Sequence, residues 1–379
     1  MSERLDEVEA RRQVAAAERI VIKIGSSLLS DPETGLSHDN ITRWCRDIVG
    51  LMNKGKQVLL VSSGAVAEGV ARLGWNPRPT DLPRLQAAAA VGQMGLVQAY
   101  ETAFAEHARH TAIVLLTHED LADRQRYLNA RSTLTHLLDL GVVPIVNEND
   151  TVATEEIRFG DNDTLAALVT NLLAADLLIV LTDVDGIYDA DPRTSPAAQR
   201  IAFAEAIDPA LDKVAGQVGA LGRGGMVTKI GAARMAARSG AHTIIADGRQ
   251  SHALTEILEG RQIGTLLAAT VHPLDARKRW IVGLKPKGTL VLDAGAAQAL
   301  RERGVSLLPV GVVSIVGDFV RGDVVRCVSE DGTVIAQGLV NYASPEVEKL
   351  FGVASERIGE RLGYAVEPEL VHRDNLVVV

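Results

Sequence analysis

Aromatic residues, cysteines and long apolar segments are all scarce in this chain of 379 residues. Phe, Trp and Tyr make up only 3% of a sequence that is 47% hydrophobic, so the core must consist mainly of Ala, Val, Leu and Ile. That composition suits parallel strands buried beneath helices. The longest apolar runs, such as residues 177–181, have the length of a strand and are too short to cross a bilayer.

The two cysteines, Cys45 and Cys327, lie far apart and form neither a metal-binding spacing nor a disulfide framework. We expect both to be reduced structural thiols, because disulfides are rare in the cytosol. The first residues contain no basic segment followed by an apolar one, which argues against a secretory signal. A soluble, cytoplasmic protein without membrane association is therefore expected.

The formal net charge is −9, and an acidic chain does not by itself attract nucleic acid or anionic membranes. Any anionic substrate would have to be bound by locally placed cations and by backbone dipoles. Lysines and the N-termini of helices are therefore the features that could bind such a substrate.

Short apolar runs alternate with longer helical patterns from about residue 19 to residue 264. This alternation predicts an α/β fold, an αβα sandwich with a mostly parallel sheet. Ligands of such sheets bind beyond the carboxyl ends of the strands. The predicted strands occupy residues 20–24, 57–63, 111–117, 142–148, 177–182 and 242–247.

The pattern changes after about residue 275, where short β-type segments with turn glycines surround one helical stretch at 294–304. We predict three parts: an N-terminal helical extension at 1–18, a catalytic domain at 19–270 and a small, mostly β domain at 280–379. All the polar motifs described next lie in the second part.

Two segments near the start of the sheet suit an anion. Lys23 lies near the end of the first predicted strand and Gly25 comes just after that strand, where a glycine allows the backbone to approach a phosphate. Ser62 and Ser63 stand between a strand and an Ala-rich helix, whose N-terminus offers free N–H groups. A solvated lysine and a simple serine helix cap are the plainer interpretations.

Two polar clusters lie a dozen residues apart, each beside an apolar element. Asn147, Glu148, Asn149 and Asp150 end a predicted strand, and Asp161, Asn162 and Asp163 open a helix. Amides could donate to the carboxylate of an amino acid while an aspartate pairs with its ammonium group. Ordinary turn and cap chemistry is the alternative, because Asn and Asp favour both.

Two further segments suit a nucleotide. Thr182 and Asp183 end a strand and begin an irregular loop. Glycines then precede a helix that carries Lys229 in its first turns, an arrangement that can cradle phosphates and that is neither a Walker A motif nor a GxGxxG motif. A flexible surface loop is the alternative interpretation of these glycines.

Taken in this order, the segments SSGAVAEG, NENDTVAT, FGDNDTLAA, TDVDGIYDADP and GRGGMVTK resemble the amino acid kinase family. The segment TDVDGIYDADP marks only the family, whereas the other four together are most similar to its members that phosphorylate the side-chain carboxylate of glutamate, at the start of proline synthesis. The tail, with GTLVLDAGAAQAL and GDFVRGDVV, resembles a PUA domain, a small mostly-β pseudo-barrel. The resemblance covers essentially the whole chain after residue 18.

The resemblance implies roles for individual residues. Lys23, Lys229 and Asp163 would be catalytic, with Asp163 orienting the two lysines. Ser63, Asp150 and Asn162 would bind glutamate. ATP would be bound by Lys23, Thr182, Asp183, Arg223, Gly224, Gly225, Met226, Val227, Thr228 and Lys229, although Arg223 stands where the family more often has a small hydroxyl residue.

The resemblance also implies partners and cofactors. ATP and Mg²⁺ are the expected cofactors, the metal being held by the ATP phosphates rather than by protein ligands. Proline is an expected feedback inhibitor, and the chain is expected to form a homo-oligomer.

Two other functions remain open from the residues. The same fold could phosphorylate another acceptor, such as aspartate, N-acetylglutamate or a nucleotide, although the two polar clusters lack the cations that a nucleotide needs. The tail could instead bind RNA, but residues 285–379 carry ten Lys and Arg against thirteen Asp and Glu. A net charge of −3 is the wrong sign for RNA.

Overall fold

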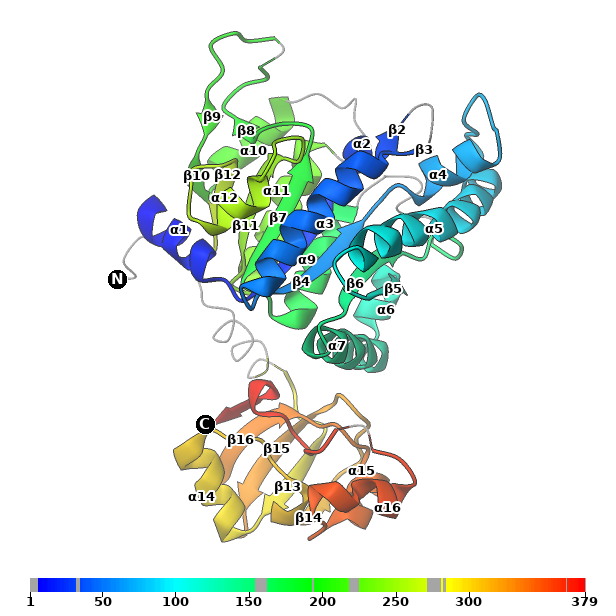
Figure 1. Ribbon diagram of the computed structural model, residues 1–379. Coiled ribbons are helices and arrows are strands. Elements are labelled where there is room, and N and C mark those ends of the chain that lie inside the picture. The colour runs from blue at the N-terminus through cyan, green and yellow to red at the C-terminus, as the bar shows by residue number, and fades with distance from the viewer. Residues whose placement is uncertain are drawn as a thin grey trace. The chain divides into compact units, whose positions relative to one another are not determined.

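The computed structural model describes residues 6–31, 35–153, 162–192, 194–217, 225–270, 281, 284–365 and 367–378 (Figure 1). The chain divides into two units. One comprises Met1–Ala122 with Asn129–Pro273, and the other comprises Asp123–Leu128 with Leu274–Val379.

An eight-stranded sheet forms the centre of the first unit, in the order β10-β12-β11-β7-β1-β4-β6-β5 (Figure 1). Every neighbouring pair is parallel except β11 with β12, which confirms the predicted αβα architecture. The six expected strands form, and the sequence patterns did not predict β10 and β12. The strands are β1 (Arg19–Ile24), β4 (Gln57–Ser62), β5 (Thr111–Leu116), β6 (Val143–Glu148), β7 (Leu177–Thr182), β10 (Phe203–Glu205), β11 (His242–Asp247) and β12 (Thr265–Ala268).

The order of the strands places a ligand site at the carboxyl end of β1. This strand lies between β4 and β7: the chain passes from β1 to β4 on one side, and it reaches β7 on the other side only after β6 and α9. Parallel sheets bind ligands where connections diverge in this way. In register, Lys23 of β1 stands opposite Val61 of β4 and Val180 of β7.

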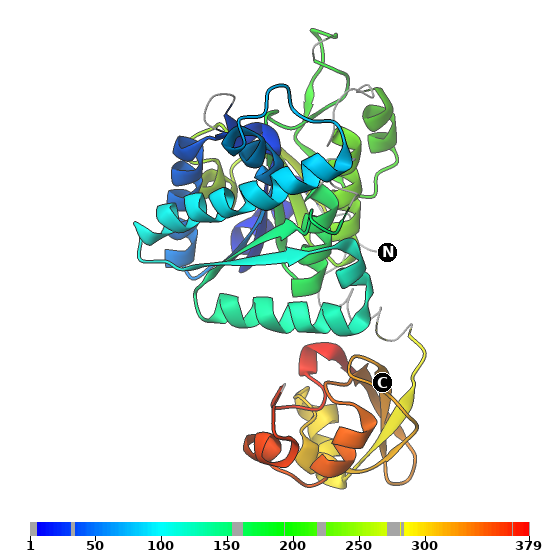
Figure 2. The same cartoon turned by 90° about the vertical axis from the view of Figure 1, so that its right-hand side faces the viewer.

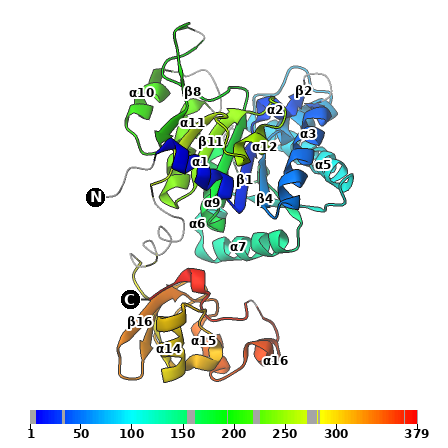
Figure 3. The same cartoon turned by 60° about the vertical axis from the view of Figure 1, so that its left-hand side comes forward.

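Helices cover both faces of this sheet (Figure 3). Ile20, Ile22 and Ile24 of β1 join a core with side chains of α1, α3, α5 and α12. Alternation along a strand directs Lys23 to the opposite face, where α9 packs against β1 and α11 against α9. The main helices of this unit are α1 (Glu7–Ala16), α3 (His38–Asn53), α5 (Leu82–Ala105), α7 (Arg124–Asp139), α9 (Asn162–Leu173), α10 (Ala210–Gln217), α11 (Met226–Arg238) and α12 (Ala253–Leu258).

Shorter elements connect the layers. They are α2 (Ser26–Leu29), the pair β2 (Ser30–Asp31) and β3 (Gly35–Leu36), α4 (Ala65–Arg72), α6 (His118–Ala122), and the pair β8 (Ile187–Tyr188) and β9 (Arg200–Ile201). In the described part of the chain, no helix has both the length and the apolar character required to span a bilayer.

Local chemistry explains where the long helices begin. Asp6 precedes α1 and accepts a hydrogen bond from the backbone N–H of Glu9, and Asp81 accepts one from Arg84 at the start of α5. An aspartate at this position satisfies an N–H group that has no partner within the helix. Pro83 stands in the first turn of α5, where a missing N–H costs nothing.

The second unit contains a five-stranded sheet in the order β14-β13-β15-β16-β17. It encloses a separate hydrophobic core, which confirms the expected small, mostly β domain. Besides the predicted helix, short helices and a last strand form from residues after 340. The elements are β13 (Gly288–Leu292), α14 (Ala294–Arg303), β14 (Val312–Val316), β15 (Val324–Ser329), β16 (Val334–Leu339), α15 (Ser344–Val347), α16 (Ile358–Leu362) and β17 (Leu376–Val378).

The helices α4 and α5 approach each other at glycines (Figure 2, where α5 is the long light-blue helix). A Cβ atom added at Gly92 of α5 would lie 1.9 Å from the carbonyl oxygen of Ala65, the first residue of α4. One added at Gly69 would lie 1.7 Å from the carbonyl oxygen of Ala88. Only glycine permits this backbone contact, which positions α5 against the start of α4, directly after Ser62 and Ser63.

We predict that Gly92→Ala lowers the free energy of unfolding by about 3 kcal/mol or more, because its methyl group overlaps backbone atoms. The matched control is Gly50→Ala in the interior of α3, where an added Cβ has no atom within 4 Å. This control should stabilise the protein by up to about 1 kcal/mol, from helix propensity alone. Urea unfolding measures both, and equal effects of the two substitutions would contradict the close helix contact.

Candidate functional site

Polar side chains gather at the carboxyl edge of the sheet, as the sequence predicted. The buried members of this group are Lys23 of β1, Ser62 and Ser63 at the end of β4, Asn147 with Asp150 at the end of β6, and Thr182 of β7. Because parallel strands end at the same edge, segments that are far apart in sequence converge there.

Asp163 connects two lysines from different elements. It lies in the first turn of α9 with no exposed surface, while Lys23 and Lys229 are 4% and 6% exposed. The Lys23 ammonium lies 2.5 Å from Oδ1 of Asp163, and the Lys229 ammonium lies 3.1 Å from Oδ2. Burial alone would raise the pKa of Asp163, but the two ammonium groups outweigh it and hold the pKa at about 2.

This triad has more positive than negative charge. Among the described residues, two buried ammonium groups contact the one carboxylate of Asp163, an arrangement that favours the approach of an anion. Asp163 cannot serve as a general base, because its low pKa and its two lysine partners keep the proton off it. The arrangement can therefore hold an anion such as a phosphoryl group, with Asp163 positioning the two cations.

Hydrogen bonds within the protein fix the orientation of the side-chain amide of Asn162. Nδ2 of Asn162 lies 2.8 Å from the carbonyl oxygen of Ser62, 2.9 Å from Oγ of Ser63 and 3.0 Å from Oδ1 of Asn147. Both of its N–H hydrogens are thus engaged within the protein. The sequence suggested that such amides donate to a substrate carboxylate, whereas Asn162 offers its Oδ1, an acceptor without a hydrogen-bond partner among the described residues.

Asp150 is a buried carboxyl group with an oxygen that could accept a further hydrogen bond. It is 6% exposed, and its Oδ1 has no hydrogen-bond partner in the described ranges. Burial raises the pKa of Asp150 to about 6, because an ionised carboxylate loses its hydration there. Together, Asp150 and Oδ1 of Asn162 present two acceptors, which suit a cationic group such as an ammonium.

The nucleotide-side residues lie at the ends of β7 and at the start of α11. The hydroxyl of Thr182 donates to the carboxylate of Asp183 at 3.1 Å. Gly225 precedes α11, Met226 begins it, Val227 is exposed, and the hydroxyl of Thr228 donates to Oδ2 of Asp163 at 2.9 Å. Arg223, Gly224 and Asp161 lie outside the described residues, so their predicted roles stay predictions.

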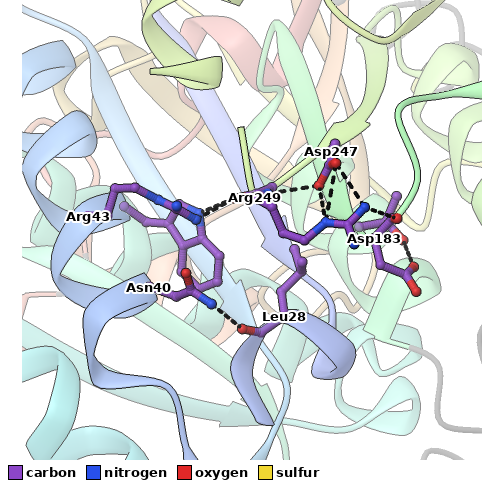
Figure 4. A network of polar contacts seen from close by, with 9 residues as sticks. Leu28, Asn40, Arg43, Asp183, Asp247 and Arg249 are labelled. Carbon is purple, nitrogen blue, oxygen red and sulfur yellow. Dashed lines mark hydrogen bonds and ion pairs between the residues drawn. The ribbon is translucent and has the colours of Figure 1, made fainter. Parts of the chain in front are cut away.

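Sequence reasoning missed a network that fixes the end of β7 (Figure 4). The guanidinium of Arg249 binds the carboxylate of Asp247 and also donates to the carbonyl oxygen of Asp183 at 2.6 Å. Beside it, the carbonyl oxygen of Gly248 accepts hydrogen bonds from Arg43 and Trp44, each at 2.9 Å. These contacts hold the loop after β11 against the loop after β7.

A weak signal for part of this network existed in the sequence. Asp247 ends a predicted parallel strand, the position at which the other site residues were found. Arg43 and Trp44 gave no signal, because they lie in a helix whose pattern only indicated packing. The same is true of Tyr100 of α5, whose hydroxyl lies 3.0 Å from the buried hydroxyl of Ser62.

The chain belongs to the amino acid kinase family, whose model matches residues 18–247. A model of the PUA domain matches residues 288–360. The chain is similar to a protein named glutamate 5-kinase from Pseudomonas putida strain F1, with 58% identity over 371 residues that cover 97% of this chain and 100% of that one. It is 59% identical to a glutamate 5-kinase of Chromohalobacter salexigens, over 98% of each chain.

We predict that Asp150→Asn stabilises the protein at pH 8 by about 3 kcal/mol and changes little at pH 4. The folded pKa is above the unfolded value, so the wild-type carboxyl costs nothing at low pH, where it is protonated in both states. Stability is then lost as the pH rises from about 4 through 6, when the buried group ionises. Asparagine avoids that cost because it is never charged.

Urea unfolding at the two pH values measures this difference. The control is Asp318→Asn, at an exposed aspartate, where the substitution removes no buried charge. If Asp150→Asn were equally destabilising at pH 4 and pH 8, Asp150 would not be a desolvated carboxylate.

Proposed function

We propose that this protein uses ATP to phosphorylate the side-chain carboxylate of L-glutamate, which yields L-glutamyl 5-phosphate, the first step of proline synthesis. The observation that carries the proposal is the placement of Lys23 and Lys229 on the buried Asp163, next in sequence to Asn162 of the acceptor cluster. The name of the relatives, glutamate 5-kinase, supports the same reaction.

Glutamate would be bound through its amino-acid end. Its ammonium would lie against Asp150 and Oδ1 of Asn162, the two acceptors that have no partner within the described structure. Ser63, which already orients Asn162, would line the same site. The side-chain carboxylate would then extend toward the two lysines.

The chemistry requires no general base. The nucleophile is a carboxylate with a reference pKa of about 4.3, which is ionised at neutral pH. Its oxygen forms a bond to the γ-phosphorus of ATP while the bond from that phosphorus to the β–γ bridging oxygen breaks, and ADP leaves with the electron pair. Lys23 and Lys229 stabilise the charge on the phosphoryl oxygens, which is the main catalytic contribution in phosphoryl transfer.

ATP would occupy the side formed by Thr182, Asp183 and the start of α11, with Arg249 holding the backbone of Asp183 in place. Among the described residues, no group of three or more His, Cys, Asp or Glu side chains could hold a metal ion. Mg²⁺, which neutralises phosphate charge when bound, would therefore be held mainly by the ATP phosphates.

Three further parts of the proposal concern organisation and control. We place the catalytic domain at residues 19–270, after an extension at 1–18, and the PUA-like domain at 280–379. We also propose that the protein forms a homo-oligomer. Proline, as the end product of the pathway, would act as a feedback inhibitor.

We predict that Lys229→Ala lowers kcat by roughly 100-fold or more, because losing one cation at the developing charge has an effect of that size. Lys23→Ala should have a similar effect. The matched control is Lys54→Ala, an exposed lysine, which should leave kcat unchanged. A Lys229→Ala protein that unfolds at the normal temperature and turns over at nearly the normal rate would exclude Lys229 from the phosphoryl site.

The acceptor is tested by trapping the acyl phosphate with hydroxylamine in the presence of ATP and each candidate amino acid. Glutamate should react well ahead of aspartate, whose carboxylate is one methylene shorter, since a misplacement of about 1 Å can cost 100-fold. N-acetylglutamate lacks the ammonium and should be inert, with a loss of up to about 10⁴-fold. Efficient use of N-acetylglutamate, or no product with glutamate, would contradict the proposed function.

A further inference from the structure

Two backbone groups fix the orientation of the side-chain amides of Asn162 and Asn147. The carbonyl oxygen of Ser62 can only accept, so it must face the nitrogen of Asn162, as it does at 2.8 Å. The backbone N–H of Glu148 can only donate, so it must face the oxygen of Asn147, as it does at 2.9 Å. These two main-chain groups fix which way each side-chain amide points.

These hydrogen bonds also fix the orientation of the side-chain amide of Gln93 in α5. With its oxygen committed to Glu148 and Asn162, Asn147 must donate through Nδ2, and it does so to Oε1 of Gln93 at 2.8 Å. The amide of Gln93 is thereby fixed with its nitrogen on the other side. That Nε2 atom is buried and has no hydrogen-bond partner in the described part of the chain.

Gln93 lies on the side of α5 that faces the acceptor cluster. Gln86, two helical turns earlier on the same side, donates to the carbonyl oxygen of Ala153 at 3.4 Å. The two glutamines thus contact both ends of the segment from Asn147 to Ala153, in which Asp150 lies. Gly92, adjacent to Gln93, lies on the closest approach of α5 to α4.

An unused buried donor requires an acceptor, because a polar group that is removed from water without a partner destabilises the protein. An ammonium group has no lone pair and cannot fill this role. A carboxylate can accept from an N–H group, and an amino acid has one beside its ammonium. The side-chain carboxylate of the acceptor is directed to Lys23 and Lys229, so the α-carboxylate is the group left for Gln93.

We propose that Gln93 is a specificity-determining residue whose Nε2 donates a hydrogen bond to the α-carboxylate of the amino acid acceptor. The inference rests on the proposed function and adds to it a recognition residue on α5. Asn147 is its positioning residue, since it decides which end of the Gln93 amide faces the substrate.

The test replaces the hydrogen-bond donor of this one contact with an acceptor. Gln93→Glu keeps Oε1 as an acceptor for Asn147 and replaces only the free Nε2 with an oxygen. We compare kcat/KM for glutamate with kcat/KM for its α-carboxamide, in which an NH₂ group replaces one α-carboxylate oxygen. The value for glutamate divided by the value for the α-carboxamide should fall by about 100-fold or more in the variant. The introduced carboxylate repels the α-carboxylate of glutamate and accepts a hydrogen bond from the carboxamide.

A purely structural role of Gln93 predicts a different result. Disturbed packing would lower kcat/KM for both substrates equally and leave their ratio unchanged, which would overturn the proposal. Gln98→Glu, an exposed glutamine on the same helix, is the control and should leave the ratio at the wild-type value. The KM for ATP should be the same in all of these proteins.

A second variant covers the case in which Gln93→Glu does not fold. Asn147→Asp keeps the oxygen that accepts from Glu148 and removes the N–H that orients Gln93. The Gln93 amide should then turn to donate to the introduced carboxylate, so its oxygen faces the substrate and the ratio falls again by about tenfold or more. An unchanged ratio in folded Asn147→Asp would overturn the inferred orientation.

These outcomes are separate from the test of the proposed function. If the wild-type protein forms no acyl phosphate from glutamate, the function itself is wrong. If the wild type phosphorylates glutamate and neither variant changes the ratio of the two substrates, the function stands and the role of Gln93 fails.

Discussion

The site depends on one interaction, the binding of two lysines by the buried carboxylate of Asp163. An isolated charge at this depth would be very costly, and the pairing of the Asp163 carboxylate with the two ammonium groups offsets that cost. Lys23 comes from the central strand, Asp163 from α9 and Lys229 from α11, so the pairing also sets the positions of three elements. A centre with two cations for one carboxylate retains the positive charge that phosphoryl transfer uses.

A second constraint orients the neutral part of the site. Backbone groups at Ser62 and Glu148 determine how Asn162 and Asn147 point, and through Asn147 they determine the orientation of Gln93. The glycine contact between α4 and α5 makes this possible, since it allows α5 to approach the end of β4. The orientation of the Gln93 amide therefore depends on the close packing of α4 against α5.

Much of the architecture could be predicted, because apolar periodicity reports directly on buried strands and helices. The six predicted strands were expected almost at their observed bounds, whereas β10 and β12, which lie next to each other at one end of the sheet, are too short to give a periodic signal. Short motifs indicate Lys23, Asp163 and Lys229 as one catalytic set, because the resemblance to the family applies to each of these positions. Gln93, Tyr100 and Arg249 were not found, since each lies in a segment whose pattern is explained by packing or by a loop.

The sequence by itself determined the αβα scaffold, the strand ends at which polar residues gather and the resemblance to a family of kinases. These depend on local chemistry: apolar spacing, capping residues and the identity of short motifs. Only the tertiary structure decided that the N–H groups of Asn162 are already used, and that Asn162 Oδ1 and Gln93 Nε2 have no hydrogen-bond partner among the described residues. Those properties arise from hydrogen bonds between residues up to 100 positions apart, and a side-chain amide has no preferred orientation until such partners are in place.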